Sequence, residues 1–336
     1  MLGTMAVLFP PSPAWIENSY VNGGYAAWQN FAYALTFPFP FSLGDVAVLL
    51  GVALIALEIF GFFRLPRRTF GDVATMAINC VAIVALYALW FEVSWGWNYV
   101  RAPIEKRVQF DASRVTPDAA AALRARAMDR INALAAPAHA RAALPLDRGS
   151  LGIAWLPAVR RAGDDWTPRV GAPKPTIANP FMLATGTSGF VNPLTLNVSL
   201  ASDLLWFERP FDLAHEWSHT AAYAREDEAN YLAIVTCLRS SDPVIEYSGW
   251  FELFLSLPQK RHYARGEFVP LVWQDLAALR RRNKAHINPM LAHWTWNTYD
   301  AYLKGNRIKS GVNNYNEVTR LMLGVPLDLQ GLPVVR

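Results

Sequence analysis

Charged residues are scarce in this chain of 336 residues. Asp, Glu, Lys and Arg together make up 17% of it, whereas hydrophobic residues make up 53%. Soluble globular domains carry charges at roughly 25% of positions, which keep their surfaces wet. The shortage of charge excludes an ordinary soluble enzyme and indicates that part of the chain is surrounded by lipid.

Cysteine, internal repeats and basic runs are also lacking. Cys80 lies in an apolar run, and Cys237 lies in the more polar remainder of the chain. Neither a disulfide framework nor a cysteine metal site is therefore expected. The net charge is +4, without the long basic stripe that binds nucleic acid. We therefore expect no nucleic-acid partner.

Two long hydrophobic runs are present instead. Residues 41–63 (FSLGDVAVLLGVALIALEIFGFF) and 73–91 (VATMAINCVAIVALYALWF) are each long enough, as helices, to cross a hydrocarbon core of about 30 Å. Buried helices of a soluble protein would normally carry a polar stripe, and these runs have almost none. The sequence predicts a membrane region over residues 1–100 with two transmembrane helices and the lipid bilayer as a partner.

The link between the two runs suggests their orientation. Arg64, Arg67 and Arg68 lie there, so the positive-inside rule places the link in the cytoplasm and residues 101–336 on the other side of the membrane. Basic residues soon after the second run weaken this prediction. Residues 1–9 are apolar but too short to span, and they are interpreted as the stub of a further transmembrane helix.

The segment His215–His219 (HEWSH) carries the strongest chemical signal. On a helix, two histidines four residues apart face the same way and can bind one metal ion, usually zinc. Glu216 lies on the neighbouring face, where it is expected to act as the general base toward the attacking water. The motif predicts a zinc-dependent metallopeptidase.

A catalytic zinc normally takes three protein ligands, so the two histidines need a companion. The segment Arg225–Asn230 (REDEAN) follows closely and offers several acids. Glu226 is favoured, because Asn230 would then lie one turn further on and could support the site by hydrogen bonding. Glu228 is the alternative third ligand, and a solvated acidic helix start with no metal role is a further alternative.

A peptidase also needs a donor for the oxyanion of its tetrahedral intermediate. His or Tyr side chains later in the chain could supply it or contact substrate, although each is more often a packed aromatic or a surface residue. The candidates are His293, Tyr299, Tyr302 and Tyr315, with His286 as a weaker one.

The soluble part reads as mostly helical with a small sheet, an α+β fold. Residues 144–180, rich in Pro and Gly, are predicted to form loops and short strands, and residues 189–199 a β-hairpin or edge strand that could receive substrate by strand addition. Predicted helices cover residues 116–135 (ended by Pro137), the region from Pro210 through His219, and residues 226–239, 243–257, 271–282, 289–303 and 312–323.

Together with the metal motif, further segments make up a pattern typical of one protein family. These segments are Trp15–Tyr20 (WIENSY), Pro40–Asp45 (PFSLGD), Phe91–Tyr99 (FEVSWGWNY), Gly189–Pro193 (GFVNP), Tyr299–Lys304 (YDAYLK), Gly311, Val312 and Tyr315. Over nearly its whole length the chain resembles the bacterial membrane family called domain of unknown function 3810. The resemblance implies a zincin-like metallopeptidase domain of the gluzincin group, anchored in the inner membrane, without an established substrate. The chain departs from relatives in its short start and in Ala221–Tyr223, where relatives often have Gly.

We therefore expect a membrane-anchored zinc metallopeptidase that hydrolyses a peptide or protein substrate outside the cytoplasm. The alternative is a catalytically silent module that keeps zinc for structure or for sensing and binding peptides. The presence of Glu216 argues against silence, because a structural zinc site has no use for a carboxylate beside its water.

Overall fold

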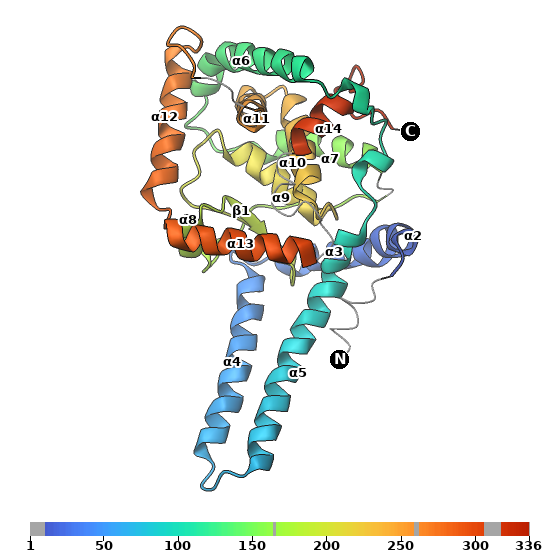
Figure 1. Cartoon of the computed structure of the whole chain (residues 1–336), viewed down its shortest axis with the longest axis vertical. Coiled ribbons are helices and arrows are strands. Elements are labelled where there is room, and N and C mark those ends of the chain that lie inside the picture. The colour runs from blue at the N-terminus through green and yellow to red at the C-terminus, as the bar shows by residue number, and fades with distance from the viewer. Residues whose placement is uncertain (1–10, 164–165, 259–261, 306–316, 336) are drawn as a thin grey trace.

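A central buried helix organises the extramembrane part of the protein. The computed structural model describes residues 11–163, 166–258, 262–305 and 317–335 (Figure 1). In α10 (Glu226–Leu238), residues 231–235 and Cys237 are 0% exposed. A helix that is apolar on all sides is stable only inside a core. Helices α7, α9, α11 and α14 pack around α10 and bury it.

The described part of the chain is mostly helical with a two-stranded sheet. Besides α10, the α-helices that follow the two apolar helices are α6 (Pro117–His139), α7 (Arg148–Arg161), α8 (Asn179–Thr185), α9 (Arg209–Thr220), α11 (Pro243–Ser256), α12 (Pro270–Ala285), α13 (Pro289–Gly305) and α14 (Val318–Gly324). Short 3₁₀ turns η2 (Gly96–Val100), η3 (Ile104–Lys106) and η4 (Ala112–Arg114) connect the second apolar helix to α6.

Two apolar helices project together from the rest of the structure (Figure 1). They are α4 (Leu43–Arg64) and α5 (Phe70–Ser94), with 22 and 25 residues. At 1.5 Å per residue they measure about 33 and 38 Å, enough to cross a hydrocarbon core. Almost none of their residues is buried within the protein. The predicted pair of long apolar helices is confirmed, and it makes this a candidate membrane protein.

The predicted hairpin is also confirmed. Strand β1 (Gly189–Val191) pairs antiparallel with β2 (Val198–Leu200), with Phe190 opposite Ser199. Both strands pack on α9. The connecting turn is closed by a 2.8 Å hydrogen bond from the backbone amide of Asn192 to the carbonyl of Asn197.

The prediction of loops and short strands over residues 144–180 is wrong for its first part, which forms α7. Asp147 caps this helix by accepting a hydrogen bond from the amide of Ser150. Its buried residues follow helical spacing: Leu151, Ala154, Trp155, Ala158 and Val159. Burial of this face outweighs the low helix propensity of two glycines and Pro157.

The predicted end of the next upstream helix is wrong as well. Helix α6 continues through Pro137 to His139. Pro137 removes one hydrogen bond in the last turn. Ala135 and Ala138 on either side are 0% exposed, so packing holds this turn in place despite the loss.

A helical segment that the sequence did not predict precedes the first apolar helix. It comprises α2 (Pro13–Trp15), a π-helical stretch η1 (Ile16–Tyr25) and α3 (Ala26–Thr36). Its buried side chains form a second apolar cluster with residues from the loop after α9, among them Ala222 and Ala224. Within this cluster, the Tyr25 hydroxyl donates to the carbonyl of Thr220, 3.1 Å away, at the end of α9. The segment therefore braces the helix that carries HEWSH.

Candidate metal centre

Helix α9 presents His215, Glu216 and His219, as the spacing predicts. Pro210 lies in its first turn, where a missing N–H has no partner to lose. The helix ends in a Schellman turn: Ala222 donates to the carbonyl of His219, and Tyr223 to that of Ser218. Ala222 has a φ of +72°, the left-handed conformation that glycine adopts most easily. The turn expected with glycine is thus formed here with alanine.

This tight turn brings the start of α10 back against α9. His215 Nε2 and His219 Nε2 lie 3.0 Å apart, and Glu226 Oε2 lies 3.3 Å from the former and 3.7 Å from the latter. Two ligand atoms held at 2.0–2.1 Å by a tetrahedral zinc are separated by about 3.3 Å. Within the described residues, these three form the one group whose ligand atoms converge closely enough to hold a metal.

The tautomer of His219 suits metal binding. Its Nδ1 lies 2.7 Å from the carbonyl oxygen of Tyr223, which can only accept a hydrogen bond. Nδ1 therefore carries the proton, and Nε2 is left with a free lone pair that points at the other two ligand atoms. Tyr223 is itself fixed by a hydrogen bond from its hydroxyl to the Val159 carbonyl at 3.1 Å. The ring is thus oriented by backbone held in the core.

The charges of the cluster call for a cation. Burial disfavours a charged His219, but the Glu226 carboxylate outweighs it and raises the pKa of His219 to about 9. Burial likewise disfavours ionised Glu226, yet the two histidines hold the pKa of Glu226 well below its usual range. Three inward-facing acceptor atoms need a shared positive charge, which a proton or a divalent metal can supply. The donor set of two imidazoles and one carboxylate fits zinc.

Glu216 lies beside this cluster and is buried. It is 4% exposed, and within the described residues its Oε2 has no hydrogen-bond partner. Burial raises the pKa of Glu216, against the opposing effect of the two histidines. A carboxylate with a raised pKa and a free oxygen is equipped to take a proton from water near neutral pH.

The start of β1 closes over Glu216. A Cβ added to Gly189 would lie 2.6 Å from Glu216 Oε1, closer than real Cβ atoms approach. Glycine at this position therefore allows the hairpin to cover the carboxylate. Sequence reasoning identified the hairpin but not this contact, which joins residues 27 positions apart.

Replacing Gly189 with Ala is expected to displace the Glu216 carboxylate while leaving the metal ligands in place. A displacement of about 1 Å in a catalytic group can cost roughly 10²-fold in rate. For the zinc-dependent peptide hydrolysis that the motif predicts, we expect kcat to fall by about that factor and zinc content to stay unchanged. The matched control is Gly152→Ala in α7, where a new Cβ meets nothing within 4 Å. Unchanged kcat in the Gly189 variant would contradict this role.

The two candidate third ligands have different surroundings. Glu226 lies with the histidines, whereas Glu228 faces the other way, where its Oε1 accepts a 2.8 Å hydrogen bond from the amide of Ile104. Arg107 and Arg225 lie 3.8 and 3.6 Å from the Glu228 carboxylate. The geometry favours Glu226. Asn230, one turn along α10, is half-buried, and its supporting role stays a prediction.

Of the residues suggested for the oxyanion, the two histidines are exposed. His293 on α13 is exposed, and its Nε2 lies 3.0 Å from the side-chain nitrogen Nδ2 of Asn297. His286 is exposed at the end of α12. The side chains of Tyr299 and Tyr302 and the whole of Tyr315 lie outside the described residues. These roles stay predictions.

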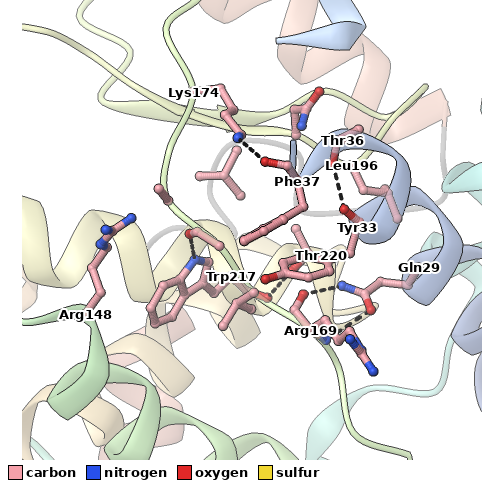
Figure 2. A pocket seen from close by; sticks show the side chains of 15 residues that line it. Gln29, Tyr33, Thr36, Phe37, Arg148, Arg169, Lys174, Leu196, Trp217 and Thr220 are labelled. Carbon is pink, nitrogen blue, oxygen red and sulfur yellow. Dashed lines mark hydrogen bonds between the residues drawn. The ribbon is translucent and has the colours of Figure 1, made fainter. Parts of the chain in front are cut away.

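A separate cavity of about 290 Å³ lies beside α9 (Figure 2). Trp217, between the two histidines in sequence, lines it and donates from Nε1 to the Gly171 carbonyl at 3.1 Å. The lining includes Arg148, Arg169 and Lys174 but no carboxylate and none of the three converging residues His215, His219 and Glu226. This cavity is distinct from the metal centre.

One family model matches most of the chain. A family model described as "Protein of unknown function (DUF3810)" matches residues 20–323. The chain belongs to this family. The resemblance suggested by the sequence is therefore confirmed, and DUF3810 covers both apolar helices and the metal cluster. No curated protein and no solved structure matches the chain.

Proposed function

We propose that this DUF3810 protein is a membrane-anchored zinc metallopeptidase with a zincin-like catalytic part. The observation that supports this most strongly is the convergence of His215 Nε2, His219 Nε2 and Glu226 Oε2 beside the buried carboxylate of Glu216. Two histidines and a glutamate are a donor set of catalytic zinc peptidases, which leave one coordination position open.

In this proposal His215, His219 and Glu226 hold the zinc. Zinc would polarise the peptide carbonyl and acidify the attacking water. Glu216 takes the proton from that water and passes it to the leaving amine, which its raised pKa suits. Gly189 of the hairpin packs against Glu216 and helps to hold its carboxylate in position.

The finer location belongs to the proposal as well. We place the protein in the bacterial inner membrane as a multi-pass protein, with its metal centre on the extracytoplasmic side. Arg64, at the end of α4, and Arg67, in the link from α4 to α5, support a cytoplasmic link by the positive-inside rule. The substrate is a peptide or protein reached from outside the cytoplasm.

The test is peptide cleavage by the purified full chain. We expect hydrolysis of a randomised peptide library to be abolished by a zinc chelator and restored by added zinc. A silent zinc-binding module would retain zinc and cleave nothing. Cleavage that persists in chelator would rule out the metallopeptidase.

A further inference from the structure

The metal centre lies next to the end of the second apolar helix. Trp95 directly follows α5, and its ring centroid lies 6.2 Å from that of His219, with the rings near perpendicular. Trp95 is buried, so its ring forms part of the wall behind a metal ligand. The first residue after a candidate membrane span therefore contacts the site.

The β1–β2 turn rests on the ends of both apolar helices. Asn197 Oδ1 accepts hydrogen bonds from the amides of Leu43 and Gly44, the first residues of α4. On the other helix, Trp90 Nε1 donates to the Leu194 carbonyl at 3.0 Å, and Ser94 Oγ donates to that of Pro193 at 2.8 Å. The turn is thus tied to the point where both helices meet the rest of the protein.

The other end of this hairpin touches Glu216 through Gly189. Asn192, at the turn, follows Gly189 after three residue steps, which corresponds to about 10 Å of extended strand. The helices α4 and α5 are only slightly longer than a hydrocarbon core, and the headgroup layer on each side adds roughly 5–8 Å. The reacting centre therefore lies at or just above the headgroups.

The face around the emerging helices is apolar. Helices α3, α8 and α13 lie at the end of the extramembrane part from which α4 and α5 project (Figure 1). Exposed large apolar side chains on or next to these helices are Phe31, Leu35, Phe37, Phe39, Phe41, Ile177, Phe181, Met290 and Trp294. Exposed apolar and aromatic residues beside a span are typical of the membrane interface.

Cations accompany this face. Lys174 Nζ donates to the Phe37 carbonyl at 3.3 Å, in the segment that leads into α4. With Arg148 and Arg169 it lines the cavity of Figure 2, which holds no carboxylate. Positive side chains next to interfacial aromatics suit the anionic headgroups of a bilayer.

We infer that the metal centre works at the bilayer surface, with this face resting on lipid, and that its substrate is the juxtamembrane segment of another membrane-inserted protein. The inference rests on the proposed peptidase function and adds the substrate class. A scissile bond a few residues beyond a transmembrane helix would lie at the height of Glu216. A bond in a distant soluble domain would not.

The first test compares three substrate libraries with the full chain reconstituted in phosphatidylethanolamine–phosphatidylglycerol vesicles. All carry the same randomised eight-residue cassette: directly after a transmembrane helix, raised by a 20-residue Glu-Ala-Ala-Ala-Lys helix of about 30 Å, or without any span. We expect the first library to be cleaved at least tenfold faster than either of the others. Glu216→Gln is the control for contaminating proteases.

The outcomes separate the two claims. Equal cleavage of the three libraries, or faster cleavage of the soluble one, would overturn the juxtamembrane substrate and leave the peptidase standing. Cleavage of none would overturn both.

The second test measures the placement on lipid without any enzymatic readout. One nitroxide label is attached at Trp294→Cys on the apolar face, and a control label is attached at Leu329→Cys, an exposed position near the end of the sequence. In both variants Cys80 is replaced by Ala, and the buried Cys237 is retained. We expect the label at 294 to collide more with oxygen than with a water-soluble nickel complex, and the label at 329 to do the reverse. A label at 294 that behaves as water-exposed would overturn the placement.

Discussion

Replacing Glu216 with Gln is expected to lower the rate of peptide hydrolysis by about 10²–10⁴-fold, the usual contribution of a general acid–base group. The amide keeps the size of the side chain but can no longer take a proton from water. Zinc content should be unchanged, because Glu216 is not one of the three residues whose ligand atoms converge. Steady-state kinetics on a cleaved library peptide, together with metal analysis, provide the measurement.

A matched control is Glu246→Gln on α11. Glu246 is partly buried and pairs with Arg130, away from the metal cluster. Its loss should leave kcat near that of the wild type. A Glu216→Gln variant as active as this control would remove Glu216 from the mechanism and with it the reason to prefer an enzyme over a silent module.

Replacing Glu226 with Ala is expected to abolish stable zinc binding. The change removes one of three converging ligand atoms and leaves His215 and His219 as an incomplete site. Loss of groups that merely support a ligand costs 10–100-fold in metal affinity, so loss of a ligand should cost more than about 100-fold. Competition with a chromogenic zinc chelator measures the change.

Glu228→Gln is the matched control for this variant. Glu228 lies two residues away on the same helix and is equally buried, but its carboxylate faces Ile104 and two arginines. Its replacement should leave zinc affinity within a few-fold of the wild type. If Glu228→Gln lost zinc and Glu226→Ala kept it, the assignment of the third ligand would be wrong.

The parts of the site that the sequence predicted are local ones. His215 and His219 share a helical turn, and Glu226 follows after seven residues, so helical periodicity and one tight turn were enough to bring them together. The two apolar helices were predictable for the same reason, because length and composition decide them.

What the sequence did not predict depends on packing between distant segments. The contact of Gly189 with Glu216 and that of Trp95 with His219 join separate elements, and no short pattern encodes them. Helix α7 was missed because Pro157 and two glycines outweighed the buried spacing of its apolar residues. Residues 13–36 were missed because their helix includes a π-helical stretch, which lacks the 3.6-residue periodicity of an α-helix.

His215, His219 and Glu226 are proposed to hold a catalytic zinc. Zinc K-edge X-ray absorption of the purified full chain, with wild type and Glu226→Ala compared, tests it most directly. We predict one zinc per chain, with two imidazole nitrogens at about 2.0–2.1 Å and carboxylate and water oxygens completing a four-coordinate shell. A wild-type protein without zinc, or a shell unchanged by Glu226→Ala, would contradict it.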